Sequence, residues 1–354
     1  GEYNYKQTAS YTDEGRAMVY KYNSSSNNWD DYGQTLIGTE NYMDLGRRVN
    51  ISHDGTIIAV SATQTDVDSG HDGLSDGFTS AEGIVRIFQY NSTSSQWDTQ
   101  DTIYGEIDPA TNVANAYTGY SMALSADGTV FVSGEWFTKE YNGYQFGEKA
   151  LIYKYDGTTW NLRDTIESPF TYDTSSQRKF GSSIALSGDG NTLAVGMQRS
   201  WDDTTDSHAN VVSLYEYNAT DTSWNSIGSI TGPYASALLG NPSTSNYFHY
   251  GLSLNNDGTV LAATRNSNSE GTEYASSSYG AVDIYNYQGN STWNKTLTKI
   301  GNDSGDAFGT TYGPVVSGDG LRFIAGSING DSNDNYQYSG SGYLSAYGTN
   351  IVIS

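Results

Sequence analysis

The chain has 354 residues, of which 40 are acidic and 17 basic, giving a formal net charge of −23. Such an acidic surface repels phosphate backbones and anionic lipids, which argues against binding to nucleic acid. No apolar run reaches the roughly 18 residues of a membrane span, so membrane insertion is not expected either. The absence of cysteine excludes disulfides and thiol chemistry but does not fix the compartment. The chain opens on Gly1 rather than Met, so we expect a processed or truncated start.

A Ser-x-Asp-Gly motif followed by a short run of apolar residues recurs five times. The copies are VNISHDGTIIAVSA (49–62), ALSADGTVFVSG (123–134), ALSGDGNTLAVG (185–196), SLNNDGTVLAAT (253–264, with Asn255 in place of Ser) and VVSGDGLRFIAG (315–326). Apolar and polar residues alternate on both sides of each motif, and Asp-Gly suits a tight hairpin turn. The motif therefore predicts a β-hairpin in every repeat.

The third copy predicts four antiparallel strands, at 180–187, 191–198, 211–218 and from Trp224 to about Thr231. Repeats of this length with four strands each are typical of propeller blades. We therefore predict an all-β chain that forms a single β-propeller over residues 1–354. The predicted pieces are a partial blade at 1–40 and blades at about 41–110, 111–170, 171–235, 236–300 and 301–354.

The first piece contains only the third and fourth strands of a blade, since no Asp-Gly hairpin precedes Trp29. Residues 2–9 can supply it with a second strand, and the terminal segment 342–354 can close the ring by pairing with it. Six blades are the favoured count. Seven are the alternative if residues are missing from the sequence.

A Tyr-x-Tyr or Phe-x-Tyr motif in the third strand, and a Trp at the start of the fourth, recur in five repeats. The Trp series is Trp29, Trp97, Trp160, Trp224 and Trp293. Alternation puts both aromatic residues of the motif on one face of the strand. We expect them to pack between neighbouring blades, and the Trp series to anchor the outer strands. Trp136 and Trp201 lie outside the repeat and are the candidate carbohydrate contacts.

Phe180-Gly181, the Asp-Gly hairpin and the LAVG run at 193–196 resemble the FG-GAP repeats of integrin alpha-chain propellers. The resemblance implies an extracellular, non-catalytic propeller for adhesion or scaffolding, often with calcium in the first hairpin. The calcium pattern is absent here because the positions alternating with each Asp are Asn, Ser, Ala or Val. One carboxylate per loop is too few for calcium. The hairpins are therefore expected to be plain turns.

Acidic residues gather instead in the loops between the second and third strands. Asp66, Asp68 and Asp72 form the best candidate calcium site, since alternate residues of a loop can converge on one cation. The competing interpretation is a solvated, mobile loop.

Asn-x-Ser/Thr sequons occur at Asn23, Asn50, Asn91, Asn218, Asn290, Asn294 and Asn302. Their total matches the number expected by chance from this composition, but four of them share one position. Asn23, Asn91, Asn218 and Asn290 each fall between the aromatic strand and the Trp, at the expected turn between strands three and four. N-linked glycans are predicted there. The alternative is that Asn simply favours turns.

These features favour a non-catalytic, N-glycosylated extracellular protein with a structural or adhesive role, including that of a filament subunit. Its partners would be further copies of itself, or other extracellular proteins and glycans. The alternative is a carbohydrate-binding propeller, with or without calcium. An enzyme ranks third, because the four His residues make no recognisable metal pair or catalytic triad.

Overall fold

The computed structural model describes most of the chain. The described residues are 1–6, 14–39, 43–63, 83–105, 118–135, 139–141, 144–146, 148–169, 179–198, 211–231, 251–265, 280–301, 308–309, 313–327 and 343–348. The chain divides into two compact units, one of residues 1–147 with 151–163 and the other of residues 148–150 with 164–354. All regular elements of the described residues are strands, and none of these residues belongs to a helix suited to crossing a membrane.

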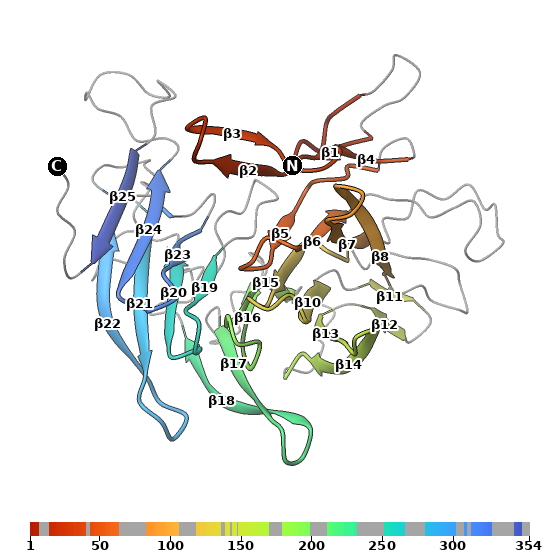
Figure 1. Ribbon diagram of the computed structural model, residues 1–354. Coiled ribbons are helices and arrows are strands. Elements are labelled where there is room, and N and C mark those ends of the chain that lie inside the picture. Colours follow the sequence, from red (N-terminus) through yellow and green to blue (C-terminus); the bar gives the residue numbers. More distant parts are fainter. Residues whose placement is uncertain are drawn as a thin grey trace. The chain divides into compact units, whose positions relative to one another are not determined.

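Four sheets each contain four antiparallel strands (Figure 1). The first contains β5 (Val49–Ile51), β6 (Ile57–Ala62), β7 (Ile84–Asn91) and β8 (Gln96–Tyr104). The second contains β9 (Ser121–Leu124), β10 (Val130–Glu135), β13 (Lys149–Tyr155) and β14 (Trp160–Glu167). The third contains β15 (Lys179–Leu186), β16 (Thr192–Gln198), β17 (Val211–Asn218) and β18 (Ser223–Thr231). The fourth contains β19 (Leu252–Leu254), β20 (Val260–Arg265), β21 (Ala281–Tyr287) and β22 (Trp293–Ile300).

The remaining sheets are smaller. β23 (Val315–Val316), β24 (Arg322–Ser327) and β25 (Tyr343–Gly348) form a three-stranded sheet, and β11 (Lys139–Tyr141) pairs with β12 (Tyr144–Phe146). Near the N-terminus, β1 (Arg16–Ala17) pairs with β4 (Leu36–Ile37), and β2 (Tyr20–Asn23) pairs with β3 (Asn28–Asp31). The last two pairs form one interrupted hairpin, which we call the first ribbon (14–38). Glu2 adds one antiparallel bridge to it, through Arg16.

The Ser and Asp side chains of the repeated motif build its turn. In the first hairpin, the Ser52 hydroxyl donates to Asp54 Oδ1 at 2.7 Å, and the Thr56 amide donates to the same oxygen at 3.0 Å. The Ile57 amide in turn donates to Ser52 Oγ at 2.9 Å. Ser125, Ser187 and Ser317 repeat the Ser–Asp bond at 2.5 to 2.6 Å. The motif is therefore a self-satisfied turn.

These hairpins also join neighbouring sheets. The His53 amide donates to the Ala126 carbonyl at 2.7 Å, and the Asn256 amide donates to the Gly318 carbonyl at 3.1 Å. Glycine allows the contact, because a Cβ on Gly188 or Gly318 would lie within 2.6 Å of the Asn256 amide group. The variable second position of the motif thus lies where two hairpins meet.

The outer strands are joined through the Trp series. Trp97 Nε1 donates to the Tyr32 carbonyl of the first ribbon at 2.7 Å, and Trp293 Nε1 donates to the Ile227 carbonyl of β18 at 3.2 Å. A Cβ on Gly33 would lie only 2.5 Å from the Trp97 ring. The expected anchoring by the Trp series is therefore observed at Trp97 and Trp293, whereas Trp29 of the first ribbon is 64% exposed.

The fold prediction is confirmed, because the chain is all-β and is built from four-stranded antiparallel sheets like those of propeller blades. The isolated ribbon at the N-terminus matches the expected partial blade. The blade boundaries and the closure by residues 342–354 stay predictions, and residues 349–354 lie outside the described part.

Candidate functional site

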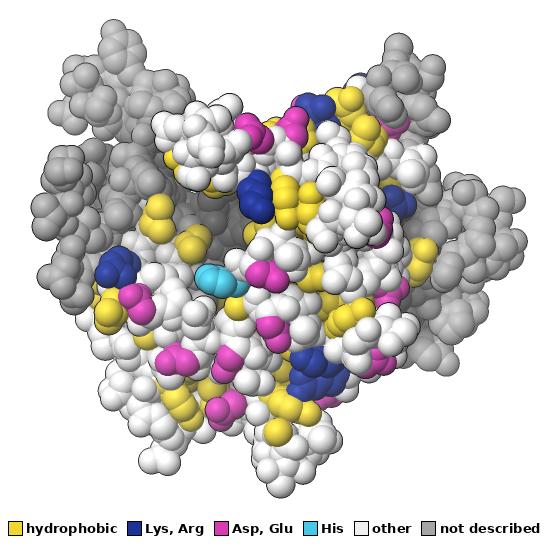
Figure 2. Space-filling model, in the orientation of Figure 1, with side chains coloured by type: hydrophobic (Ala, Val, Ile, Leu, Met, Phe, Trp, Pro, Cys, Tyr) yellow, Lys and Arg dark blue, Asp and Glu magenta, His cyan; other side chains and the backbone are white. Residues whose placement is uncertain are grey.

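Charged side chains are few in this chain, and on the face shown in Figure 2 the acidic ones lie scattered singly. Against that background, one almost fully enclosed group combines charged, hydroxyl and aromatic side chains. It comprises Asp44, Arg47, Arg48, Thr118, Tyr120 and Glu135, and we call it the arginine cluster. Its members lie just before β5 and β9 and at the end of β10. Because strands one and two are antiparallel, these positions share one end of their sheets, opposite the Asp-Gly hairpins.

Arg48 is 4% exposed and connects two sheets. Its backbone amide donates to Ser61 Oγ at 3.1 Å, and its side-chain Nε donates to the Tyr120 carbonyl at 2.8 Å. The guanidinium carbon lies 5.9 Å from the centre of the Tyr120 ring. A buried arginine needs such partners, since an unpaired charge would cost several kcal/mol. Arg48 therefore fixes the position of Tyr120.

Arg47 lies beside the same tyrosine, with its guanidinium carbon 5.7 Å from the centre of the ring. Its Nη1 lies 3.2 Å from Asp44 Oδ2, and the two side chains are 13% and 8% exposed. Asp44 has a backbone φ of 56°, in the left-handed region where Asp and Asn are enriched among non-glycine residues.

Glu135 ends β10 and is fully buried. Its Oε1 accepts a hydrogen bond from Thr118 Oγ1 at 2.7 Å. Between Thr118 and Tyr120, the Gly119 amide donates to Ser133 Oγ, and a Cβ at Gly119 would lie 2.6 Å from the Ser61 Cβ. The segment 118–120 is thus held on one side by the sheet of Arg48 and on the other by the sheet of Glu135.

The arginine cluster combines a carboxylate, a guanidinium with donors left over after pairing, and an aromatic ring. Guanidinium groups recognise carboxylates and phosphates through paired N–H donors, and they can stabilise an oxyanion. A nearby carboxylate can accept a proton from water. The described residues contain no group of three or more His, Cys, Asp or Glu side chains that would hold a metal ion.

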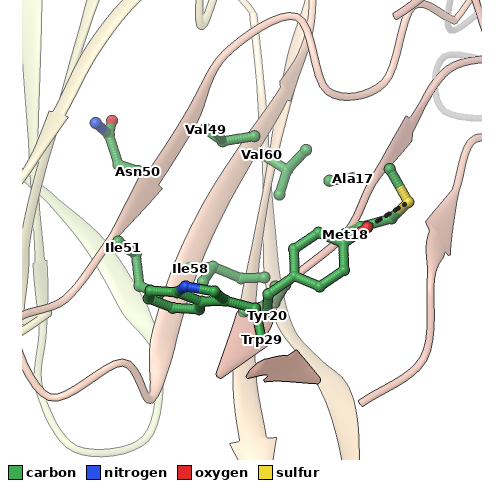
Figure 3. Close-up of a pocket in the computed structure, with 10 residues that line it drawn as sticks. Ala17, Met18, Tyr20, Trp29, Val49, Asn50, Ile51, Ile58 and Val60 are labelled. Atoms are coloured by element: carbon green, nitrogen blue, oxygen red, sulfur yellow. Dashed lines mark hydrogen bonds between the residues drawn. The ribbon is translucent and has the colours of Figure 1, made fainter. Parts of the chain in front are cut away.

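A second feature is an apolar groove of about 420 Å³ between the first ribbon and β5. Tyr20, Trp29, Val49 and Ile51 line it and are 47% to 64% exposed. Figure 3 shows the Trp29 indole beside Ile51 and Ile58, while the Asn50 side chain points away. The matching residues of β19, Leu252 and Leu254, are only 7% and 8% exposed. The groove therefore marks the place where the first ribbon lacks inner strands among the described residues.

Several predicted site residues lie outside the described residues: Asp66, Asp68, Asp72, Trp136, Trp201 and Asn302. The predicted calcium and carbohydrate sites therefore stay predictions. Of the other sequons, Asn23, Asn91 and Asn218 end the third strand of their repeats, directly before the expected turn, and Asn290 lies between β21 and β22. Asn294 is exposed on β22, whereas Asn50 is half-buried in β5 with its Oδ1 buried and without a hydrogen bond among the described residues.

The arginine cluster was missed from the sequence, although one signal was present. Arg47 and Arg48 are adjacent in a chain with only 17 basic residues. The signal is weak, because Arg178 and Lys179 form a second adjacent pair of cations. Glu135 and Thr118 carried no comparable signal, because they meet only through the pairing of different strands.

No protein-family model matches the chain, and no curated protein sequence matches it. Among solved structures, the chain is similar to a protein of Bacteroides uniformis assigned as a 6-phosphogluconolactonase. The TM-score is 0.51 and the identity 11%, over 95% of this chain and 79% of that one. The periplasmic gluconolactonase of Pseudomonas aeruginosa has a TM-score of 0.47 and 11% identity, over 94% of this chain and 78% of that one. At such low identity the first likeness shows the fold.

The first of these neighbours corrects the earlier expectations about family and function. The resemblance to integrin FG-GAP repeats is wrong, because no family model supports such repeats and the neighbour with a TM-score of 0.51 is instead assigned as a 6-phosphogluconolactonase. The error has a physical cause, since an Asp-Gly turn followed by an aliphatic strand suits any tight hairpin. The prediction of a non-catalytic adhesive, filament-forming or lectin-like module is likewise contradicted, because that neighbour is assigned as an enzyme.

Proposed function

We propose that this protein is a hydrolase that opens the lactone ring of an anionic, sugar-derived substrate. The observation that carries the proposal is the arginine cluster, where Arg47 pairs with Asp44 and lies near the rings of Tyr120 and Tyr3. The fold supports it, since the structural neighbour from Bacteroides uniformis is assigned as a 6-phosphogluconolactonase.

Each group of the cluster has a role in the proposed reaction. Asp44 accepts a proton from a water molecule while the water oxygen adds to the lactone carbonyl carbon. The guanidinium donors of Arg47 that Asp44 leaves free stabilise the resulting oxyanion. The ring C–O bond then breaks, and the leaving ring oxygen takes up the proton held by Asp44. The balance is one lactone and one water giving one hydroxy acid.

Arg48 and Glu135 are positioning residues in this scheme. Arg48 holds the Tyr120 carbonyl, and Glu135 holds Thr118, so together they fix the segment that forms one wall beside Arg47. A rigid wall matters because a misplacement of about 1 Å can reduce a rate roughly 100-fold.

The test measures ring opening of δ-gluconolactone and 6-phosphogluconolactone in a pH-stat, with the spontaneous rate subtracted. The unaltered protein should accelerate ring opening. Arg47→Gln and Asp44→Asn should each lower kcat/KM by about 100- to 1000-fold, the range found when an oxyanion donor is removed. Arg322→Gln is the matched control, since Arg322 is half-exposed and pairs with Asp319 of an Asp-Gly hairpin.

The proposal fails if neither lactone reacts faster than the spontaneous rate. It also fails if Arg47→Gln and Asp44→Asn retain the rate of the Arg322→Gln control. Circular dichroism of each variant separates loss of the fold from loss of chemistry.

We further propose that the protein is exported and works outside the cytoplasm. One structural neighbour is by name a periplasmic enzyme. The sequons at four aligned turns support an extracellular location. Fractionation of the source cells, followed by detection of the intact protein, tests this point.

A further inference from the structure

Three of the turns between strands three and four, those of Asn23, Asn91 and Asn218, share one detailed geometry. The turn of Asn290 differs, since Asn290 has a φ of 50° and its carbonyl accepts the Thr292 hydroxyl at 3.2 Å. In the first ribbon, Asn23 Oδ1 accepts the Ser25 amide at 3.0 Å, and Asn23 Nδ2 donates to Asp30 at 2.8 Å. In the next sheet, Asn91 Oδ1 accepts the Thr93 amide at 3.0 Å, and Asn91 Nδ2 donates to Asp98 at 2.8 Å. Each Asn therefore caps its own turn through Oδ1 and links the turn to an Asp on the following strand through an Nδ2 hydrogen bond.

The third sheet follows the same plan with a small change. Asn218 Oδ1 accepts the Thr220 amide at 2.9 Å, and Asn218 Nδ2 donates to Asp221 at 3.0 Å. Residues 219–222 are exposed, as are residues 24–28 and 92–96 of the other two turns. All three turns are thus open to a large modifying group.

The turn uses the backbone amide of the residue two positions after the Asn, and not its side chain. The hydroxyls of Ser25, Thr93 and Thr220 make no hydrogen bond to any of the described residues. Any residue with a backbone N–H would serve the fold equally well. Yet all three positions carry a hydroxyl, as the Asn-x-Ser/Thr acceptor sequence requires.

The hydrogen bond to Asp is compatible with a sugar on the same nitrogen. An Asn side-chain amide has two N–H donors, and each Asp accepts one of them. A glycan linked to Nδ2 replaces the other hydrogen and leaves the bond in place. The turn would then hold the first sugar in a fixed direction away from the sheet.

We propose that Asn23, Asn91 and Asn218 are attachment sites for N-linked glycans. The structure separates them from the sequon at Asn50, whose Oδ1 is buried and which lies in the middle of β5. In each four-stranded sheet, the turn between strands three and four lies at the end opposite the start of strand one, because successive strands are antiparallel.

The chain contains its own matched control for this proposal. The turn of the second sheet has Asp156 where the others have Asn, and Asp156 Oδ1 accepts the Thr158 amide at 2.8 Å. The sequence there is Asp156-Gly157-Thr158. Asp156→Asn therefore completes a sequon in a turn that has the same side-chain cap but is two residues shorter between the Tyr and the Trp.

The experiment expresses the full chain in insect cells behind a secretion leader. Peptide N-glycosidase F in H₂¹⁸O converts each glycosylated Asn to an ¹⁸O-labelled Asp, which chymotryptic peptide mapping then locates. Label is expected at positions 23, 91 and 218, and not at 50. Thr93→Ala should remove the label at 91 alone, and Asp156→Asn should add a label at 156.

The proposal is overturned if positions 23, 91 and 218 carry no label in the secreted protein. It is also overturned if position 50 is labelled while they are not, or if Thr93→Ala leaves the label at 91. These outcomes do not depend on lactone hydrolysis, so the two proposals can fail separately.

Discussion

The contact between Trp97 and the first ribbon gives the sharpest test of how neighbouring sheets are held together. Trp97 is 3% exposed, and its indole N–H donates to the Tyr32 carbonyl. Its ring lies edge-on to Tyr90 at 5.2 Å between centroids. Trp29 occupies the same repeat position but is 64% exposed. The two residues therefore allow one substitution to be compared in a closed and an open contact.

The magnitude follows from the buried area. With about 250 Å² for a Trp side chain, Trp97 hides roughly 240 Å² and Trp29 roughly 90 Å². At about 25 cal/mol per Å², these areas correspond to about 6 and about 2 kcal/mol relative to an extended chain. Unfolded chains already hide part of this area, so measured costs are lower. We expect Trp97→Ala to lower the free energy of unfolding by about 3 to 5 kcal/mol, and Trp29→Ala by less than about 2 kcal/mol.

Urea unfolding followed by far-ultraviolet circular dichroism measures both changes without relying on Trp fluorescence. Trp97→Phe serves as a third variant, because it keeps an aromatic ring and loses only the N–H donor and part of the area. It should cost about 1 to 2 kcal/mol. Equal losses in Trp29→Ala and Trp97→Ala, or no loss in Trp97→Phe, would refute the assignment of Trp97 as the contact that holds the ribbon.

Two further predictions concern charged side chains. The Ser52 hydroxyl lowers the pKa of Asp54, and the Thr259 hydroxyl lowers the pKa of Asp257. The Ser317 hydroxyl lowers the pKa of Asp319 to about 2. Because a depressed folded pKa stabilises the protein above the unfolded value of about 3.9, stability should be lost as the pH falls from about 4 toward 2. The urea midpoint should depend less steeply on pH across this range in the Asp54→Asn variant than in the unaltered protein. An unchanged slope would contradict the contribution assigned to the lowered pKa of Asp54. In the buried pair Arg265–Asp283, at 3.1 Å, Arg265→Ala should cost about 3 kcal/mol, the low end for breaking a buried pair, because Asp283 keeps the Thr298 hydroxyl at 2.6 Å and Lys295 at 4.0 Å. The double variant Arg265→Met/Asp283→Leu removes both charges and should be more stable than Arg265→Ala, with most of the loss recovered. If the double variant is as unstable as Arg265→Ala, lost packing and not the unpaired charge is responsible.

The strands of the repeats could be predicted closely from the sequence. Strands expected at 180–187, 191–198, 211–218 and 224–231 correspond to β15, β16, β17 and β18 within one residue at each end. The prediction succeeded because alternation and Asp-Gly turns are local signals, and each hairpin satisfies its own polar groups through Ser and Asp.

Short sequence motifs could not identify the arginine cluster as the candidate site. Arg48, Tyr120 and Glu135 are far apart in the sequence and belong to segments that begin or end different strands. Their approach depends on how two sheets pack, which no short motif encodes. For the same reason, the Ser-x-Asp-Gly motif suggested the wrong family, since it reports a turn and not the chemistry at the other end of the sheet.

The sequence by itself determined the all-β class, the hairpins and the place of the Asn turns, because these depend on contacts between residues only a few positions apart. Only the tertiary structure decided which side chains are buried together. It showed that Trp97 is buried while Trp29 is exposed, although both occupy the same repeat position. It also showed that Asn91 lies at an exposed turn while the Asn50 side-chain oxygen is buried, although both belong to sequons. Burial depends on the neighbouring sheet, so it becomes visible only when the sheets are assembled.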